Sequence, residues 1–218
     1  MASSYSKKEG VVEHQRRNVT AIFGAGESGK TTFAIRYLLN APHLAHRFIF
    51  DPDGEFAGRL KLHAAGTPLD LEVAIRQPWT CFDPQAIYGA HTDQGLAGFA
   101  DIVGRFSAAL PGRKAFVCDE SWRHLSPRGL PEELLEIVKT GRKAGLESVW
   151  LSQEPRELNE TILAEATEIV CFRLDGLNSL GRLGDYGFPR QEELPQLAKG
   201  EFIAWNKLSG GVRPGKLF

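Results

Sequence analysis

A glycine-rich turn between an apolar run and a helix-forming segment constrains the fold of this chain more than any other feature. Residues 18–32 read Asn-Val-Thr-Ala-Ile-Phe-Gly-Ala-Gly-Glu-Ser-Gly-Lys-Thr-Thr. The β-branched and apolar run Val19–Phe23 predicts a buried strand, and Lys30–Leu39 predicts a helix. Glycines let the backbone between them curl so that successive N–H groups point inward, next to the positive end of the helix dipole. Strand, glycine turn and helix in this order are the setting of a phosphate-binding loop.

The spacing Gly24-x-x-x-x-Gly29-Lys30-Thr31 assigns a task to each part of this loop. Backbone N–H groups of the loop and of the first helical turn are expected to bind phosphate oxygens. We expect Lys30 to reach the β- and γ-phosphates of a nucleotide, and the Thr31 hydroxyl to hold Mg²⁺. The alternative is a glycine-rich turn that binds nothing. The predicted nucleotide-binding residues are Gly24, Ala25, Gly26, Glu27, Ser28, Gly29, Lys30, Thr31 and Thr32.

The composition is ordinary for a soluble globular protein: 42% of the 218 residues are hydrophobic and 24% are charged. This length is enough for one sizeable α/β domain. A formal net charge of -1 means that any basic surface for nucleic acid must be local. The sequence contains no apolar run long enough to span a bilayer, and we expect no signal peptide. Cys81, Cys118 and Cys171 lie far apart in apolar runs, which suits buried thiols in a reducing compartment, so we expect a cytoplasmic protein without a stable membrane span.

Strand-like apolar runs alternate with helical segments along the rest of the chain. We expect further strands at residues 47–51, 79–82, 114–120, 148–153, 168–173 and 201–205. Helices are expected at residues 69–76, 94–110, 130–143, 158–167 and 176–186. This alternation predicts a single-domain α/β fold, with a mainly parallel sheet covered by helices on both faces.

The two ends of the chain differ in composition from this alternating region, which spans residues 18–206 and is assigned to one domain. Residues 1–10 are small and polar and then basic at Lys7 and Lys8, and residues 11–17 lead into the first strand, so we expect an N-terminal arm over residues 1–17; a tail without a role is the alternative. Residues 207–218 include Lys207, Arg213 and Lys216 but no acid, so we expect an extended basic C-terminal tail.

Two carboxylates follow the apolar run that ends at Cys118. An acid at the end of a buried strand can hold Mg²⁺ through its water shell, and a second acid one residue later can polarise water toward the γ-phosphate. We therefore predict Asp119 as the metal-side carboxylate and Glu120 as the general base. The alternative is that both acids merely open a loop.

Two further side chains are candidates for catalysis. Gln153 ends an apolar run, and its neutral amide can hydrogen-bond the γ-phosphate or the attacking water; a helix cap or loop role is the alternative. Arg142 lies between a predicted helix end and the strand that leads to Gln153. A cation there suits the helix dipole, but it is also placed to act as an arginine finger in the site of a neighbouring subunit.

Four segments together resemble the FtsK–HerA superfamily of DNA-pumping ATPases. They are Asp51-Pro-Asp-Gly-Glu-Phe56, Asp119-Glu120, Gly141-Arg142-Lys143-x-Gly145 and Leu151-Ser-Gln153-Glu-Pro155-x-Glu-Leu158-Asn159. The resemblance covers residues 18 to about 206. In its small size the chain is most similar to the genome-packaging ATPases of tailless, internal-membrane or adenovirus-like viruses.

The resemblance implies a RecA-like P-loop NTPase core whose sensor strand lies between the phosphate-loop and Asp-Glu strands. It also implies a homo-oligomeric ring, a pentamer or hexamer, with ATP and Mg²⁺ at subunit interfaces, Arg142 acting in trans and double-stranded DNA in the pore. The expected function is that of an ATP-driven motor that packages a viral genome. Its setting would be the host cytoplasm or the virion, with a capsid vertex or portal-like protein as partner. Family members often carry Arg after the sensor Gln, where this chain has Glu154, and the departure bears on local DNA or interface contacts.

In the sequence, local groups of basic residues are the only candidates for a DNA-binding surface. Arg123 and Arg128 follow Glu120, and the C-terminal segment adds others. Such groups can track phosphates without reading base sequence, but solvated surface charge is the alternative.

Other classes of protein share parts of this pattern. The phosphate loop also resembles that of heterotrimeric G-protein α subunits, but Asn206-Lys-Leu-Ser209 lacks the acid that a guanine-reading motif needs. A phage morphogenesis ATPase of the zonula-occludens-toxin type usually adds a membrane span. A cellular HerA-like DNA-processing ATPase usually carries an N-terminal barrel. A non-enzymatic nucleotide-binding scaffold is expected to lack Glu120 or Arg142.

Overall fold

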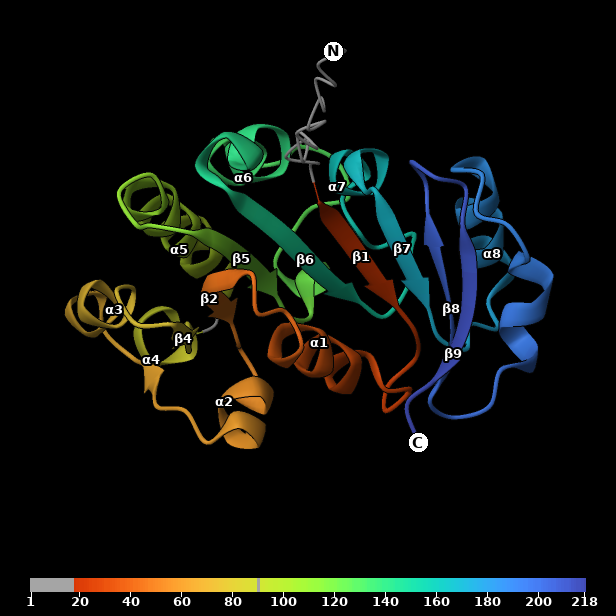
Figure 1. Ribbon diagram of the computed structural model, residues 1–218, viewed down its shortest axis with the longest axis horizontal. Coiled ribbons are helices and arrows are strands. Elements are labelled where there is room, and N and C mark those ends of the chain that lie inside the picture. The colour runs from red at the N-terminus through yellow and green to blue at the C-terminus, as the bar shows by residue number, and fades with distance from the viewer. Residues whose placement is uncertain (1–17, 90) are drawn as a thin grey trace, which may run out of the picture.

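The computed structural model describes residues 18–89 and 91–218. Its central element is one β-sheet (Figure 1). In that part of the chain the sheet has nine strands in the order β3-β4-β2-β5-β6-β1-β7-β8-β9. Neighbours from β3 to β7 are parallel, and β8 and β9 are added antiparallel at one edge. The strands are β1 (Val19–Phe23), β2 (Leu44–Phe50), β3 (Ala64–Ala65), β4 (Trp79–Phe82), β5 (Arg113–Cys118), β6 (Leu146–Ser152), β7 (Glu168–Cys171), β8 (Glu201–Asn206) and β9 (Val212–Lys216).

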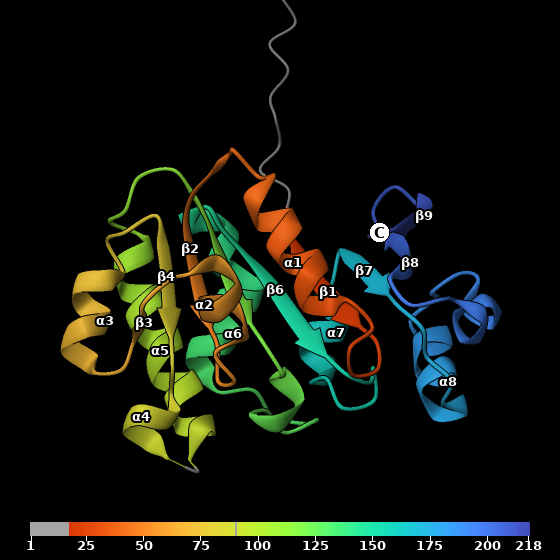
Figure 2. The same cartoon turned by 90° about the horizontal axis from the view of Figure 1, so that it is seen from below.

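Helices cover both faces of this sheet. Figure 1 shows α5, α6 and α7 on one side of the central strands and α1 and α2 on the other, and Figure 2 shows α3 and α4 at one end of the sheet and α8 at the other. In the described residues, no helix combines the length and the apolar character needed to cross a bilayer. The α-helices are α1 (Lys30–Leu39), α2 (Glu55–Leu60), α3 (Pro68–Ala74), α4 (Gln85–Tyr88), α5 (Thr92–Ser107), α6 (Glu132–Thr140), α7 (Glu160–Glu165) and α8 (Leu177–Asp185), and the short 3-10 turns are η1 (Ser121–Arg123), η2 (Gly141–Ala144) and η3 (Gln191–Gln196).

The continuous apolar character of the central strands follows from burial on both faces. Successive side chains of a strand point to opposite sides. Ala21 and Phe23 therefore pack in the core under α5 and α6, whereas Ile22 packs in the core under α1 and α2. Phe116 and Val117 divide in the same way. The predicted single-domain α/β fold, with a mainly parallel sheet and helices on both faces, is confirmed.

The strand order brings three sequence-distant segments to one edge of the sheet. Strand β6 lies between β1 and β5, as expected, and all three are parallel. Their carboxyl ends therefore meet, and the Gly24 N–H donates to the Gln153 carbonyl at 3.3 Å. Asp119 joins the same edge through its N–H, which donates to the Phe50 carbonyl at the end of β2.

The C-terminal segment is part of the sheet, whereas the sequence predicted an extended basic tail over residues 207–218. Residues Val212–Lys216 form β9, which pairs with β8. Leu217 is buried and packs in the core with Phe172. Hydrogen bonding to the edge strand β8 and burial of Leu217 hold the C-terminal segment in the sheet. The sequence prediction rested on the three cations of this segment, which indicate neither contact. The predicted N-terminal arm, residues 1–17, lies outside the described residues.

Replacing Phe116 by alanine is expected to destabilise the protein by about 3–5 kcal/mol. The Phe116 ring lies between Phe99 and Trp150, at centroid distances of 5.6 and 5.5 Å, so its removal leaves a cavity in the centre of the core. The free energy of unfolding in urea measures this loss. Leu177→Ala is the control, because that side chain is 85% exposed and its loss is expected to cost less than about 0.5 kcal/mol. Equal losses would contradict the assignment of Phe116 to the core.

Candidate functional site

The loop between β1 and α1 needs its glycines for conformation and for space. Gly29 has φ +118°, in the region that favours glycine. A Cβ there would lie 2.7 Å from Leu217 Cδ1. At Gly24 a Cβ would lie 2.6 Å from Ser28 Oγ. The loop therefore keeps a tight curve at the amino end of α1, where unpaired backbone N–H groups attract an anion.

Lys30 is buried at the start of α1 and bends back over this loop. Its ammonium donates hydrogen bonds to the carbonyls of Gly24 at 2.8 Å and Ala25 at 3.2 Å. Burial lowers the pKa of Lys30, and the carboxylates of Glu120, Asp119 and Glu55 act in the opposite direction. The cation is therefore held inside the loop that was predicted to bind phosphate.

Ser28 provides a test of whether the loop fits a phosphate group. Its hydroxyl is buried and has no hydrogen-bond partner among the residues that the structure describes. A buried polar group without a partner costs about 1–3 kcal/mol. A phosphate oxygen in the loop would give this hydroxyl an acceptor. Together with the position of Lys30, the unpaired hydroxyl shows that the residues of the loop fit a phosphate.

Carboxylates crowd the side of the loop that faces β5. Asp119 is only 2% exposed, and burial raises its pKa to about 8, with further increases from the charges of Glu120, Glu55 and Asp51. The Thr31 hydroxyl donates to Glu55 Oε2 at 3.0 Å. Within the described residues, no group of three or more His, Cys, Asp or Glu side chains could hold a metal ion. Mg²⁺ usually takes only one or two protein oxygens in addition to substrate phosphates. A nearby cation also stabilises the ionised form of a buried acid whose pKa is raised. Thr31 and Asp119 are therefore suitable ligands for Mg²⁺.

Asp119→Asn is expected to stabilise the nucleotide-free protein, and to do so more at pH 8 than at pH 5. The folded-state pKa of Asp119 is about 8, whereas an unfolded Asp has a pKa of about 3.9. The folded state therefore binds this proton more tightly, and folding stability is lost as the pH rises between those two values. With these two pKa values, removing the acid should raise the free energy of unfolding by up to about 5 kcal/mol at pH 8 and by about 1–2 kcal/mol at pH 5.

Urea denaturation at both pH values, without nucleotide or Mg²⁺, measures the effect. The exposed Asp185 supplies the control variant Asp185→Asn, for which little change is expected. A gain of the same size at pH 5 and pH 8 would contradict the assignment of a raised pKa to Asp119.

Glu120 and Gln153 come from different strands and meet beside the loop. Gln153 Nε2 donates to Glu120 Oε2 at 3.4 Å, and the Trp122 indole N–H donates to the same oxygen. The Glu120 backbone is left-handed, with φ 45°. Such backbone strain in a non-glycine residue persists where the surroundings enforce it, often at functional sites. The predicted base and sensor are thus brought together, and Trp122 is a third member that sequence reasoning missed.

A cavity of about 380 Å³ opens between the loop and Glu120. Four of its lining residues were given no role from the sequence: Glu55, Arg59, Lys199 and Phe218. Arg59 donates to Thr32 Oγ1 at 2.7 Å and pairs with Glu55. The i,i+4 spacing of Glu55 and Arg59 on one helix was a usable signal. Lys199 and Phe218 are distant from the loop in sequence, and no local pattern identified them.

Comparison with solved structures identifies the fold to which this site belongs. The chain is similar to the genome-packaging NTPase B204 of Sulfolobus turreted icosahedral virus 2 in complex with AMPPCP, with TM-score 0.76, 20% identity, and coverage of 93% of this chain and 98% of B204. The complex of B204 with ATP-γS gives the same TM-score and identity. This is the fold of a RecA-like P-loop NTPase. The P-loop NTPase fold also includes VirB4 of Thermoanaerobacter pseudethanolicus, with TM-score 0.67, 12% identity, and coverage of 94% of this chain and 90% of VirB4. No family model and no curated protein matches the sequence.

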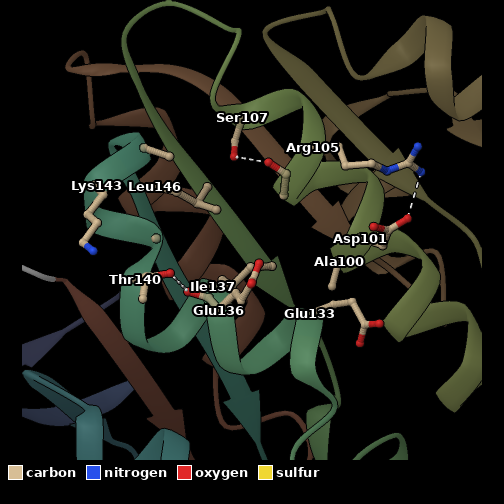
Figure 3. Close-up of a pocket in the computed structure, with 13 residues that line it drawn as sticks. Ala100, Asp101, Arg105, Ser107, Glu133, Glu136, Ile137, Thr140, Lys143 and Leu146 are labelled. Atoms are coloured by element: carbon tan, nitrogen blue, oxygen red, sulfur yellow. Dashed lines mark hydrogen bonds and ion pairs between the residues drawn. The ribbon is translucent and has the colours of Figure 1, made fainter.

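In this P-loop fold, Arg142 lies away from the cavity that holds Lys30. It is exposed in η2, before the amino end of β6, whereas Gln153 follows the carboxyl end. Strand β6 has 7 residues, so at about 3.3 Å per residue it separates these ends by roughly 20 Å. Figure 3 shows a second cavity here, of about 420 Å³, which Thr140 and Lys143 help to line. The structure does not bring Arg142 to the site of its own subunit, so its role in trans stays a prediction.

The loops that follow β5 and β6 carry the remaining predicted residues, Arg123, Arg128 and Glu154. Arg123 pairs with Asp53 at 2.9 Å, which joins the loop after β5 to the loop after β2. Arg128 is exposed beyond η1. Both lie near the carboxyl edge of the sheet, and their contact with DNA stays a prediction. Glu154 accepts a hydrogen bond from Ser179 Oγ at 3.0 Å and also pairs with Arg156.

Asn206 and Lys207 occupy the edge of the sheet opposite the phosphate loop. Strand β8 runs antiparallel to β7, and Asn206 is in register with Glu168 at the start of β7. The Asn206 side chain accepts hydrogen bonds from Leu208 and Ser209 in a turn. This placement gives no support to a guanine-reading role and agrees with the missing acid in the motif.

Proposed function

We propose that this protein is a Mg²⁺-dependent ATP hydrolase that moves double-stranded DNA and packages a viral genome into its capsid. One observation carries the hydrolase proposal: Glu120 is held by Gln153 and Trp122 beside the loop that contains Lys30. The similarity of the whole chain to a structure described as a genome-packaging NTPase supports the choice of DNA packaging.

The proposed mechanism uses the side chains in fixed roles. The substrate is Mg²⁺-ATP: the oxygen of a water molecule would bond to the γ-phosphorus while the bond from that phosphorus to ADP breaks, which gives ADP and phosphate. The loop N–H groups and Lys30 bind the phosphate oxygens, and Thr31 and Asp119 hold the metal side. Glu120 accepts a proton from the attacking water, and Gln153 orients that water through its amide. Because the Gln153 amide donates a hydrogen bond to Glu120, a change in the position or protonation of one side chain directly affects the other.

The proposed assembly follows from the position of Arg142. Arg142 lies at the opposite edge of the sheet from its own site, which supports a role in the site of a neighbouring copy. A ring of five or six subunits would place one such arginine at each ATP site, where it stabilises charge in the transition state. Double-stranded DNA would occupy the pore, and a capsid vertex or portal-like protein would hold the ring, in the host cytoplasm or on the virion.

Double-stranded DNA is expected to stimulate ATP hydrolysis, with a smaller effect at higher salt. The reason is that phosphate binding by Lys and Arg releases counterions, so affinity falls as salt rises. The measurement is the steady-state ATPase rate with and without duplex DNA at several salt concentrations, together with the mass in solution. Arg128→Ala should weaken stimulation across DNA sequences, whereas the distant control Lys143→Ala should not. A rate that ignores DNA at every salt concentration would contradict the proposed motor.

A further inference from the structure

An aromatic side chain lines the phosphate-loop cavity on the side away from Glu120. Phe218 is 65% exposed and lines the cavity together with Lys199 and the loop itself. Figure 1 shows the C-terminal end of the described chain close to the loop that follows β1. A large apolar ring exposed in a polar cavity is a candidate ligand contact, because such a ring gains free energy when another flat apolar surface covers it.

The backbone around Phe218 is fixed to the phosphate loop by a chain of contacts. The Leu217 N–H donates to the Gly200 carbonyl at 3.0 Å, and the Gly200 N–H donates to the Ser28 carbonyl at 3.2 Å. The Arg36 guanidinium donates to the Leu217 carbonyl, and the Leu217 side chain is buried against Gly29. These contacts hold the segment in place independently of the Phe218 ring.

The outer atoms of the Phe218 ring lie against Gly200, which has no side chain to displace them. A Cβ at Gly200 would lie 2.7 Å from ring atoms Cε2 and Cζ. Gly200 also has φ +82°, in the region that favours glycine. The outer part of the ring is therefore supported by the backbone at Gly200, while the residue as a whole stays exposed and lines the cavity.

The strand order places Phe218 opposite the hydrolytic side chains. Glu120 follows β5 and Phe218 follows β9, and β1 with its phosphate loop lies between those strands in the sheet. Lys199, on the same side as Phe218, pairs with Glu27 of the loop at 3.6 Å. A nucleotide with its γ-phosphate toward Glu120 therefore directs its nucleoside toward Phe218.

We propose that Phe218 is the stacking platform for the base of the bound nucleoside triphosphate. This inference rests on the proposed function only in that the loop must bind a triphosphate. Stacking uses the flat face that every base has and does not read its edge, so the platform should serve ATP and GTP alike. Base stacking on an aromatic ring contributes enough free energy for a loss of about tenfold in affinity when the ring is removed.

The test compares a nucleotide with a ligand that lacks a base. Calorimetry measures the Kd of AMPPCP and of inorganic tripolyphosphate, both with Mg²⁺, for the wild type, Phe218→Ala and Phe218→Trp. We expect Phe218→Ala to weaken AMPPCP binding by about tenfold and to leave tripolyphosphate binding unchanged. Phe218→Trp should retain AMPPCP binding. Leu208→Ala is the matched control, because Leu208 is similarly exposed but lies outside the cavity lining.

The outcomes separate failure of this inference from failure of the phosphate site. Unchanged AMPPCP binding by Phe218→Ala would overturn the platform, and so would equal weakening of both ligands, since that result indicates a role in loop shape. Lys30→Ala should weaken both ligands. If the wild type binds neither ligand, or if Lys30→Ala changes neither affinity, the proposed nucleotide site itself is wrong.

Discussion

Glu120→Gln is expected to bind ATP as the wild type does and to hydrolyse it about 10²–10⁴-fold more slowly. The amide keeps the shape of the side chain and an oxygen that can accept from Trp122 and Gln153. It cannot accept a proton from the attacking water. Single-turnover hydrolysis and equilibrium ATP binding, measured on the same preparation, separate the chemical step from affinity.

The matched control for this change is Glu136→Gln on α6, which makes the same replacement away from the phosphate loop. Its hydrolysis rate should equal that of the wild type. Wild-type turnover by Glu120→Gln would remove the general-base assignment. Loss of ATP binding by Glu120→Gln would instead show that the carboxylate acts on the nucleotide ground state.

Arg142→Ala is expected to reduce hydrolysis about 10³–10⁵-fold, and mixing with Lys30→Ala subunits should restore part of the activity. Each variant alone lacks one half of every interface. In a mixed ring, an Arg142→Ala subunit keeps its Lys30 site, and a Lys30→Ala neighbour supplies the missing arginine. With equal, random mixing, about one interface in four has this productive order. The measurement is the ATPase rate of assembled mixtures over a range of ratios.

Lys143→Ala is the control for the mixing experiment, since Lys143 is the adjacent exposed cation. Its rings should stay active, and its mixtures with Lys30→Ala should show no activity beyond the sum of the parts. If rings that contain both Arg142→Ala and Lys30→Ala subunits form but stay inactive, Arg142 does not act across the interface.

Local patterns account for the parts of this protein that the sequence predicted well. The run Val19–Phe23 and the glycines after it are adjacent in the chain, so strand, turn and helix could be read together. The proximity of Glu120 and Gln153 could also be predicted, because parallel strands bring their carboxyl ends to one edge of the sheet.

The features that sequence reasoning missed depend on contacts between distant segments. Trp122 is two residues from Glu120, but nothing in that spacing shows that its indole turns back to the carboxylate. Phe218 reaches the phosphate loop only because β9 pairs with β8 and Leu217 is buried. The cations of the last segment indicated a solvated tail, and tertiary pairing overrode that local composition.

If Arg142 acts in trans, its location at the amino edge of the sheet also restricts how copies can assemble productively. In a two-fold dimer, residue i of one copy contacts residue j of the other and the reverse, so such a dimer could complete two sites but would then be closed. Head-to-tail contacts also give every pocket a donor, and they confer a common polarity around a closed ring of more than two copies. Hydrolysis can then pass from subunit to subunit in one direction around the ring, which a two-fold symmetric pair does not allow.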